Sequence, residues 1–387
     1  MCHSFFEKLG FAHKAEFDEY FDKAIKQFEK YGNKIFNVED KSVFGIYLDE
    51  IESYAVELQK DSDNFIYAYM LAELITYGKE SMVYSVSKPY ADKKSACYDI
   101  MPLFSLLWCL PEMINEHKRR EVPERITRDT IGMFENQIGD FVLLNGHIGI
   151  SSYVNWMMSF IKCKIIRVGR FNLEMCKFAN KYVVLKNSDK VVILADGDAY
   201  HSSGRVLGSI GCEDTTNSFE CEFVEHEEYF EGCVCDGEFC TRECQRFYKA
   251  DGWKIALSQG DPIVSVHIPT GGPLNPQECN NDLKIGAEII KRCFGDFKAF
   301  YCSSWLLDPQ LKRIIGKETN LTAFGDRFTR FSVKSSGNEV FEYVFNLHSA
   351  VPPCELNATT SLSKLLKEHF LSGGHIYGAA GVIFDEE

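Results

Sequence analysis

The 387-residue sequence has a deficit of basic residues and no run of positive charge. Asp and Glu outnumber Lys and Arg by 56 to 42, which gives a formal net charge of -14. No stretch of Lys and Arg is longer than Lys118-Arg119-Arg120, so we expect no nucleic-acid partner. The start, MCHSFFEKLGF, lacks the basic segment and apolar run of a secretion signal. We find no apolar stretch of membrane-spanning length, so we expect no membrane partner and a cytoplasmic protein.

The sequence also lacks the features of a disulfide framework. Its 15 cysteines are an odd number and are scattered through expected strands and helices, which favours reduced, buried thiols. Four of them lie close together in the sequence, preceded by Cys221 and His226: Cys233, Cys235, Cys240 and Cys244. Their spacing is not a usual zinc motif. We therefore expect no metal and interpret this segment as a solvent-exposed insertion between two strands, with a zinc site as the alternative.

Residues 1 to about 160 show helical periodicity almost throughout. Apolar residues recur at intervals of three and four along 17–31 and 44–58, after Asn64, and along 103–114, 127–138 and 150–163. Pro111 should start a turn or a kink. The aromatic stripes lie at core spacing, so we interpret them as packing residues and not as a ligand box.

From Lys164 onward the apolar period changes from 3.6 to 2, which predicts strands. The first four, 164–175, 181–186, 190–195 and 219–224, should form an antiparallel meander. A helix should open at Asp308-Pro309, two strands at 329–334 and 339–346 should be joined by a hairpin loop at 335–338, and a last helix should cover 361–371. This order is typical of an α+β protein with one parallel crossover.

The segment 259–309 carries the strongest local signals and predicts a strand, a glycine turn, a helix and a strand. Ile263 to Ile268 is β-branched and bounded by prolines, as short buried strands are. Asn275, Pro276 and Glu278 then supply an N-cap, a proline at the first helical position and an acid three residues after the cap.

The turn between this strand and helix has the features of an anion site. Gly271 and Gly272 let the backbone approach a ligand, and the N–H groups of the helix's first turn point the same way. A pyrophosphate held there would lie at the positive end of the helix dipole. Glu278 and Asp282 argue against an anion, and a plain strand-to-helix turn is the alternative.

Three phrases in the second half resemble those of a bacterial family of acyltransferase-domain proteins with a GNAT-like fold. They are GRFNLEM at 169–175, VHIPTGGPL at 266–274 and SWLLDP at 304–309. The resemblance covers roughly residues 120 to 380. It implies an N-terminal helical domain followed by a GNAT-like mixed sheet flanked by helices, with a V-shaped gap between two strands. We place the domains at 1–125 and 126–387, the second divided into halves at 126–258 and 259–387.

The resemblance also implies an acyl-CoA site on the backbone between the fourth superfamily strand and its helix. By the order of the elements, this site is Gly271, Gly272, Leu274 and Asn275. The usual superfamily turn, Q/R-x-x-G-x-G/A, does not match 270–273. Pro273 has no N–H to donate, so one expected donor is missing.

Acyl transfer from a thioester needs a base for the acceptor and an acid for the leaving thiolate. His267 is the first candidate for the base, because imidazole titrates near neutral pH; a histidine hydrogen-bonded between core strands is the alternative. Tyr301 and Ser304 are candidates for the acid, although a hydroxyl at a strand end often caps a turn. We interpret Cys302 as a buried thiol.

Arg170 and Glu174 should share one face of a strand and form an ion pair, or contact substrate.

The sequence thus predicts an acyltransferase that moves an acyl group from acetyl-CoA or another acyl-CoA to a small amine or hydroxyl acceptor, with a homodimer as the assembly to consider. A catalytically silent GNAT-like protein that binds a ligand or partner is the alternative, which Pro273 and Glu278 favour.

Overall fold

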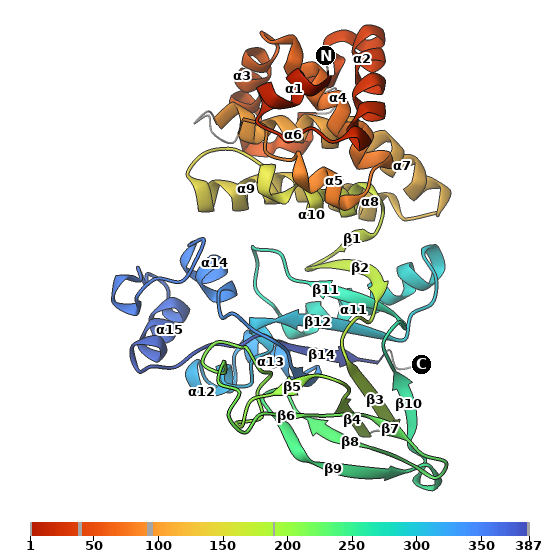
Figure 1. Cartoon of the computed structure of the whole chain (residues 1–387), viewed down its shortest axis with the longest axis vertical. Helices are drawn as coiled ribbons and strands as arrows, with labels where there is room; N and C mark the ends of the chain where they lie inside the picture. The colour runs from red at the N-terminus through yellow and green to blue at the C-terminus, as the bar shows by residue number, and fades with distance from the viewer. Residues whose placement is uncertain (1, 38–40, 91–95, 189, 385–387) are drawn as a thin grey trace. The chain divides into compact units, whose positions relative to one another are not determined.

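The computed structural model describes residues 2–37, 41–90, 96–188 and 190–384, and the chain divides into two compact units, Met1–Arg167 and Val168–Glu387 (Figure 1). This division comes later than the boundary that we placed between residues 125 and 126, which falls inside helix α8 (Glu124–Ile131). The helix α10 (Val154–Ile161) packs against earlier helices of the first unit. Residues as far as the start of the first strand therefore belong to the helical unit.

The first unit is helical, as expected. Besides α8 and α10 it contains α1 (Cys2–Leu9), α2 (Asp18–Tyr31), α3 (Leu48–Leu58), α4 (Ser62–Tyr77), α5 (Glu80–Ser85), α6 (Ala96–Trp108), α7 (Leu110–Arg119) and α9 (Met133–Asn145). Helix α4 is buried on most sides, because α2 and α6 both pack against it. The helix expected at 44–58 is interrupted, since Gly45 has a φ of 52°. Pro111 lies at the start of α7, where a proline is tolerated, and α6 ends just before it.

One expectation about apolar length needs correction. The segment Cys97–Arg119 is long and apolar enough to cross a membrane by length and composition. In the structure 67% of its apolar window is buried among the other helices of its unit. A core helix passes the same test, and this segment packs as one.

The second unit is built on a six-stranded sheet with the order β1-β2-β11-β12-β14-β13. Its strands are β1 (Ile165–Val168), β2 (Phe171–Lys177), β11 (Pro262–His267), β12 (Ala299–Ser304), β13 (Thr329–Ser332) and β14 (Ala379–Ile383). β11 and β12 are parallel and are joined by helix α11 (Pro276–Cys293), so the predicted strand–turn–helix–strand unit and the α+β class are confirmed. α11 packs on β2, where Gly286 lies against Leu173.

A second sheet packs against the opposite face of the first. Its strands follow the order β10 (Lys254–Leu257), β3 (Tyr182–Asn187), β4 (Lys190–Ala195), β8 (Tyr229–Cys235) and β7 (Val224–Glu225), with β9 (Cys240–Tyr248) paired to β8. β5 (Ala199–Tyr200) and β6 (Phe219–Glu220) form a separate pair. Tyr182 and Ile193 from this sheet share one core cluster with Ile263 and Phe331 from the first, so the core lies between the sheets.

Several predictions for this unit differ from the structure. The antiparallel meander expected of the first four strands does not form, because β2 pairs with β11 in the first sheet while β3 and β4 pair in the second, and the strand expected at 219–224 is two short strands, β6 and β7, in different sheets. The strand expected at 164–175 is two strands, because Gly169, with a φ of 50°, turns the chain between β1 and β2. The strand expected at 339–346 is helix α14 (Glu339–Phe345), so 335–338 is not a hairpin loop. Glu339 and Glu342 suit a helix N-terminus, and Phe341 stacks on Phe370 with ring centroids 5.3 Å apart.

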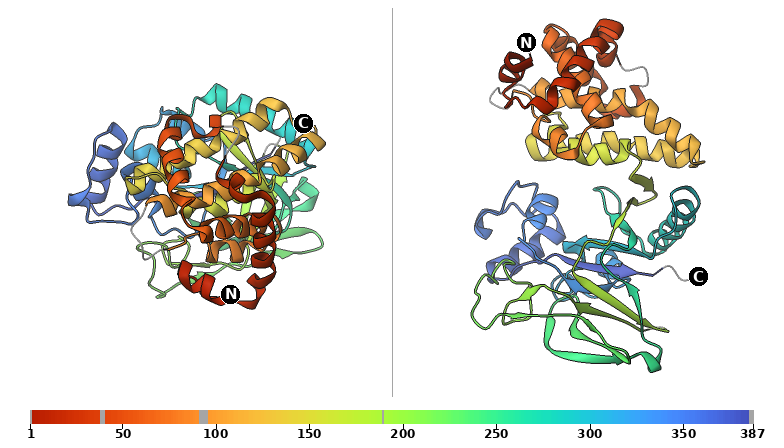
Figure 2. Two further views of the ribbon diagram at one scale, coloured as in Figure 1. Left: turned by 90° about the horizontal axis from the view of Figure 1, so that it is seen from above. Right: turned by 45° about the vertical axis from the view of Figure 1, so that its right-hand side comes forward.

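Three further α-helices of the second unit lie among the described residues. They are α12 (Leu311–Ile314), α13 (Asn320–Gly325) and α15 (Ser361–Leu371). Figures 1 and 2 show α14 and α15 together at one end of the unit and α11 toward the other. The sheet edge where β11 ends lies between these groups, and the predicted site residues gather there.

Candidate functional site

The parallel strands β11 and β12 pair over only three residues each. Their register joins Ile263 to Ala299 and ends where Ser265 pairs with Tyr301. Beyond that point β11 continues along β2 as far as His267, and β12 continues along β14 to Ser304. The two central strands therefore separate at this level, which is the strand separation expected from the sequence.

His267 forms a pair with Glu174 on the face of the sheet that looks toward the second sheet. Its Nε2 lies 2.9 Å from the Glu174 Oε2. Both side chains are partly exposed, 35% for His267 and 26% for Glu174. A carboxylate can only accept a hydrogen bond, so the His267 Nε2 carries a proton in this pair. The pair is a histidine oriented by a carboxylate and open to solvent, which is the arrangement of a general base.

Arg170 does not pair with Glu174, so the ion pair predicted between them is wrong. Its guanidinium instead donates to three carbonyl oxygens of the glycine turn: those of Pro269 at 2.6 Å, Gly271 at 3.0 Å and Gly272 at 3.1 Å. Burial lowers the pKa of Arg170 from its ordinary value. Because arginine is protonated across the whole accessible range, a fixed positive charge still lies against the turn.

Because Arg170 engages the carbonyl oxygens of the glycine turn, the backbone N–H groups of the turn are the ones left to contact a ligand. Gly271 has a φ of 105°, and Cβ atoms built at Gly271 and Gly272 would meet no heavy atom within 4 Å. Within the described part of the chain, no acceptor is assigned to the N–H groups of Gly271, Gly272 and Leu274. Gly271 and Gly272 are exposed and Leu274 is buried, so the two glycines present the backbone of the turn to solvent beside a cation, which suits an anion.

The first turn of α11 offers fewer donors than its sequence suggested. The Asn275 side chain accepts from the N–H groups of Gln277 at 3.0 Å and Glu278 at 3.3 Å, and Pro276 has no N–H. The Asp282 carboxylate does not face the turn as a free charge, because its Oδ2 accepts a hydrogen bond from the backbone N–H of Arg170 at 2.8 Å. An anion here would rest on the glycine turn and not on the helix end itself.

The two proposed acid groups lie at different depths along β12. The Tyr301 hydroxyl accepts from the Asn180 side-chain amide at 3.0 Å, and its ring packs on Phe178 and Phe331. Burial raises the pKa of Tyr301, so the phenol keeps its proton at neutral pH. Ser304 caps the short helix Trp305–Leu307, where its Oγ accepts from the Leu306 N–H at 3.2 Å.

A cavity of about 430 Å³ lies in the second unit, and Tyr182 is among the residues that line it. Asn180, which donates to the Tyr301 hydroxyl, lines one part of it, and apolar residues such as Val206 and Val333 line another. Two charged residues of opposite sign, Asp198 and Lys334, also line the cavity. Burial raises the pKa of Asp198 from its ordinary value.

The clustered cysteines are part of the second sheet, so the prediction of a solvent-exposed insertion is wrong. Cys233 and Cys240 are buried on β8 and β9, and Cys244 is exposed. The Cys233 and Cys244 sulfurs are 3.1 Å apart across the two strands. Cys302, expected as a buried thiol, is fully buried in the first sheet, and burial raises its pKa to about 12.

The comparisons with known proteins agree with this architecture. Residues 165–383 match the family model described as the GNAT-like C-terminal domain, and residues 51–163 match the N-acyltransferase N-terminal domain. The boundary between the two matches falls where the structure divides the chain. No curated protein matches significantly.

Solved acyltransferase structures share the fold along nearly the whole chain. One, in complex with decanoyl-CoA, has a TM-score of 0.63 at 17% identity and covers 100% of this chain and 99% of that chain. Another, in complex with decanoyl-CoA and teicoplanin, has a TM-score of 0.63 at 16% identity and covers 99% and 98%. A mutant acyltransferase in complex with octanoyl-CoA has a TM-score of 0.64 at 15% identity and covers 100% of both chains.

Proposed function

The chain belongs to the family of the GNAT-like C-terminal domain, and from that premise we propose that it moves an acyl group from acyl-CoA to a small amine or hydroxyl acceptor. The observation that carries the proposal is local. Two parallel strands separate next to a carboxylate-oriented histidine and a glycine turn whose carbonyls are held by an arginine. These are the parts that acyl transfer from a thioester requires.

The CoA pyrophosphate would accept hydrogen bonds from the backbone of Gly271, Gly272 and Leu274, with the Arg170 charge beneath the turn. Asn275 is already engaged as the helix cap, so its contribution would be to hold the helix start in place. Pro273 donates nothing. Arg170 supplies a positive charge against the turn in place of the missing donor.

In the reaction the acceptor nitrogen or oxygen attacks the thioester carbonyl carbon while the carbon–sulfur bond breaks. His267 takes the acceptor proton, and Glu174 stabilises the resulting imidazolium through Nε2. Tyr301 returns a proton to the CoA thiolate, and the Asn180 amide holds the tyrosine oxygen in place. Ser304 is the alternative acid.

The cavity lined by Asn180, which donates to the Tyr301 hydroxyl, supports a small acceptor. It holds a carboxylate and an ammonium group among apolar walls, which suits a compact molecule with a charged group of its own. Similar structures were solved with decanoyl-CoA, octanoyl-CoA and teicoplanin. Medium-chain acyl-CoA donors and a larger acceptor are therefore further substrates to test.

The test begins with calorimetric titration of CoA, acetyl-CoA and decanoyl-CoA at low and at physiological salt. We expect saturable binding that weakens with salt, since the ligand phosphates meet Arg170. Acceptors are then screened for release of free CoA thiol. His267→Ala should lower turnover by about 10²–10⁴ and leave acyl-CoA binding unchanged.

A catalytically silent binding protein is the second candidate. Pro273 and the capped N-terminus of α11 favour it, because both reduce the donors at the turn. Acyl-CoA that binds but is not consumed with any acceptor would establish this alternative. Absence of both heat and thermal shift with every CoA ligand would instead point to a protein partner.

A further inference from the structure

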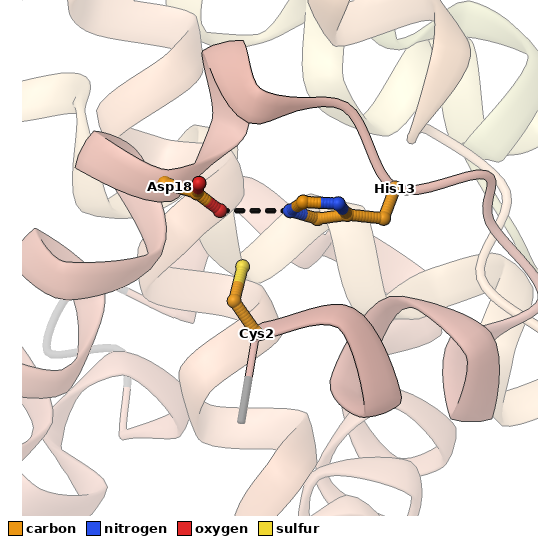
Figure 3. Close-up of side chains that lie close together, drawn as sticks. All are labelled: Cys2, His13 and Asp18. Carbon is orange, nitrogen blue, oxygen red and sulfur yellow. Dashed lines mark hydrogen bonds and ion pairs between the residues drawn. The ribbon is translucent and has the colours of Figure 1, made fainter.

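We propose that Cys2, His13 and Asp18 form a binding site for one divalent transition-metal ion, Zn²⁺ in the first place, at the start of the helical unit. One donor atom from each residue lies within 4.8 Å of the other two (Figure 3). In the described ranges of the chain, this is the only set of three or more His, Cys, Asp or Glu residues that converges in this way. The site is separate from the acyl-transfer residues of the second unit.

The donor set has the chemistry of a zinc site. Thiolate, imidazole and carboxylate bind Zn²⁺ at about 2.3, 2.0–2.1 and 2.0–2.2 Å, which puts neighbouring ligand atoms of a tetrahedron roughly 3.3–3.7 Å apart. The His13 Nε2 and Asp18 Oδ1 are 2.7 Å apart, so this nitrogen–oxygen pair would open by roughly 0.6–0.8 Å around an ion. Zn²⁺ displaces the thiol proton of Cys2, and a water completes the fourth position.

Three separate pieces of backbone bring the donors together. Cys2 begins α1, Asp18 begins α2 and His13 lies in the segment that joins them. The His13 ring is held edge-on against the buried Phe6, with centroids 5.6 Å apart, and lies 5.5 Å from the His3 ring. An ion would therefore fasten the starts of α1 and α2 to the loop between them, which is a structural role.

The same unit contains a natural control for this geometry. His147 Nε2 lies 2.9 Å from Asp99 Oδ2, and the Ser151 hydroxyl donates to Asp99 Oδ1 at 2.6 Å. This second group repeats the histidine–carboxylate pair with a hydroxyl in place of the thiol. A soft thiolate is what selects zinc over harder cations, so the second group should not compete for it.

The experiment titrates the full, chelator-treated protein with Zn²⁺ and, separately, with Co²⁺ as a spectroscopic probe. We expect about one Zn²⁺ per chain, and a sulfur-to-cobalt charge-transfer band of matching stoichiometry. Cys2→Ser should remove the band, and Asp18→Asn and His13→Ala should each weaken binding at least about tenfold. His147→Gln and Cys244→Ser should change neither.

Two results would overturn the assignment. Failure of the metal-free parent protein to take up saturating Zn²⁺ would mean that the three side chains only satisfy one another. A cobalt band that survives in Cys2→Ser and disappears in Cys244→Ser would place the metal in the β8–β9 hairpin instead. Circular dichroism of each metal-free variant checks that it is folded, and Asp18→Asn serves as the conservative variant if another does not fold.

Discussion

The pair of His267 and Glu174 is the residue-scale unit on which the proposed chemistry rests. The two residues are 93 positions apart in the sequence. Only the antiparallel register of β2 and β11, in which Glu174 pairs with Ser265 and Asn172 with His267, brings their side chains to one face. His267 is hydrogen-bonded across two strands, as in the structural alternative that the sequence left open, but 35% of its side chain is exposed.

This pairing gives a test of whether the two residues act together. We expect His267→Ala to lower kcat by about 10²–10⁴, the usual contribution of a general base, with acyl-CoA affinity unchanged. Glu174→Gln should lower kcat less, because it leaves a hydrogen-bonding group at Nε2. Steady-state kinetics and calorimetry on both variants and on the double variant are the measurements.

If the pair is one unit, the double variant is no worse than His267→Ala alone. Losses that instead multiply would show that Glu174 acts elsewhere, and a kcat unchanged in His267→Ala would remove the histidine from the mechanism.

Arg170 allows a second residue-scale prediction, on binding. Its planar fork reaches three carbonyls of the turn, which a lysine ammonium cannot do. Arg170→Lys should therefore raise the Kd for CoA by about tenfold or more and leave kcat at saturating acyl-CoA nearly unchanged. Arg246→Lys, an exposed partner of Glu231 in the second sheet, is the matched control. Equal CoA affinity in the parent and Arg170→Lys would contradict the anion site on this turn.

At the scale of elements, the sequence predicted what local signals specify. The strand at β11 and the helix start at Asn275-Pro276 were correct, because proline, glycine and capping residues act over a few positions. The role of Arg170 was missed, since its acceptors are about a hundred residues away and are backbone groups that carry no sequence signal. Residues 339–346 were wrongly predicted to form a strand, because Val340 and Phe341 fit the apolar period of a strand as well as that of a helix. Packing of Phe341 on α15 stabilises the helix.

The contact between α7 and α8 makes the stability of the helical unit depend on pH. His117 is fully buried on α7, its Nδ1 lies 3.0 Å from the Thr127 hydroxyl of α8, and its Nε2 has no partner among the described residues. Burial lowers the pKa of His117 to about 4, from 6.5. The unfolded chain therefore binds a proton below about pH 6.5 that the folded protein does not bind until about pH 4.

The free energy of unfolding should fall as the pH drops through this window, by up to about 3 kcal/mol from this residue. Urea unfolding of the parent and of His117→Gln between pH 7 and 4.5 measures it. Other groups contribute equally to both proteins, so the difference between them isolates the histidine. A difference that does not change with pH would show that His117 is charged, or free to reach water, in the folded protein.

At the scale of the whole molecule, the chain consists of two units that each carry a core and, by our proposals, a different ligand. Zn²⁺ would bind residues of the first unit, and acyl-CoA would bind the glycine turn of the second. Ligands on separate compact units should stabilise them independently unless some coupling free energy links the two sites.

Hydrogen exchange on the full chain, resolved by peptide, tests this independence. We expect Zn²⁺ to slow exchange in peptides that cover residues 2–18, and decanoyl-CoA to slow it in peptides that cover 267–278, each without effect on the other. Cys2→Ser should remove the protection by Zn²⁺ and keep the protection by decanoyl-CoA. Arg170→Lys should keep the protection by Zn²⁺ and require more decanoyl-CoA for the same protection of 267–278. Protection of the helical unit by decanoyl-CoA would contradict independence, because a coupling free energy must then link ligand binding on the second unit to the stability of the first. The helical unit would then take part in acyl-CoA recognition, and its variants would have to be included in the kinetic analysis of the transfer step.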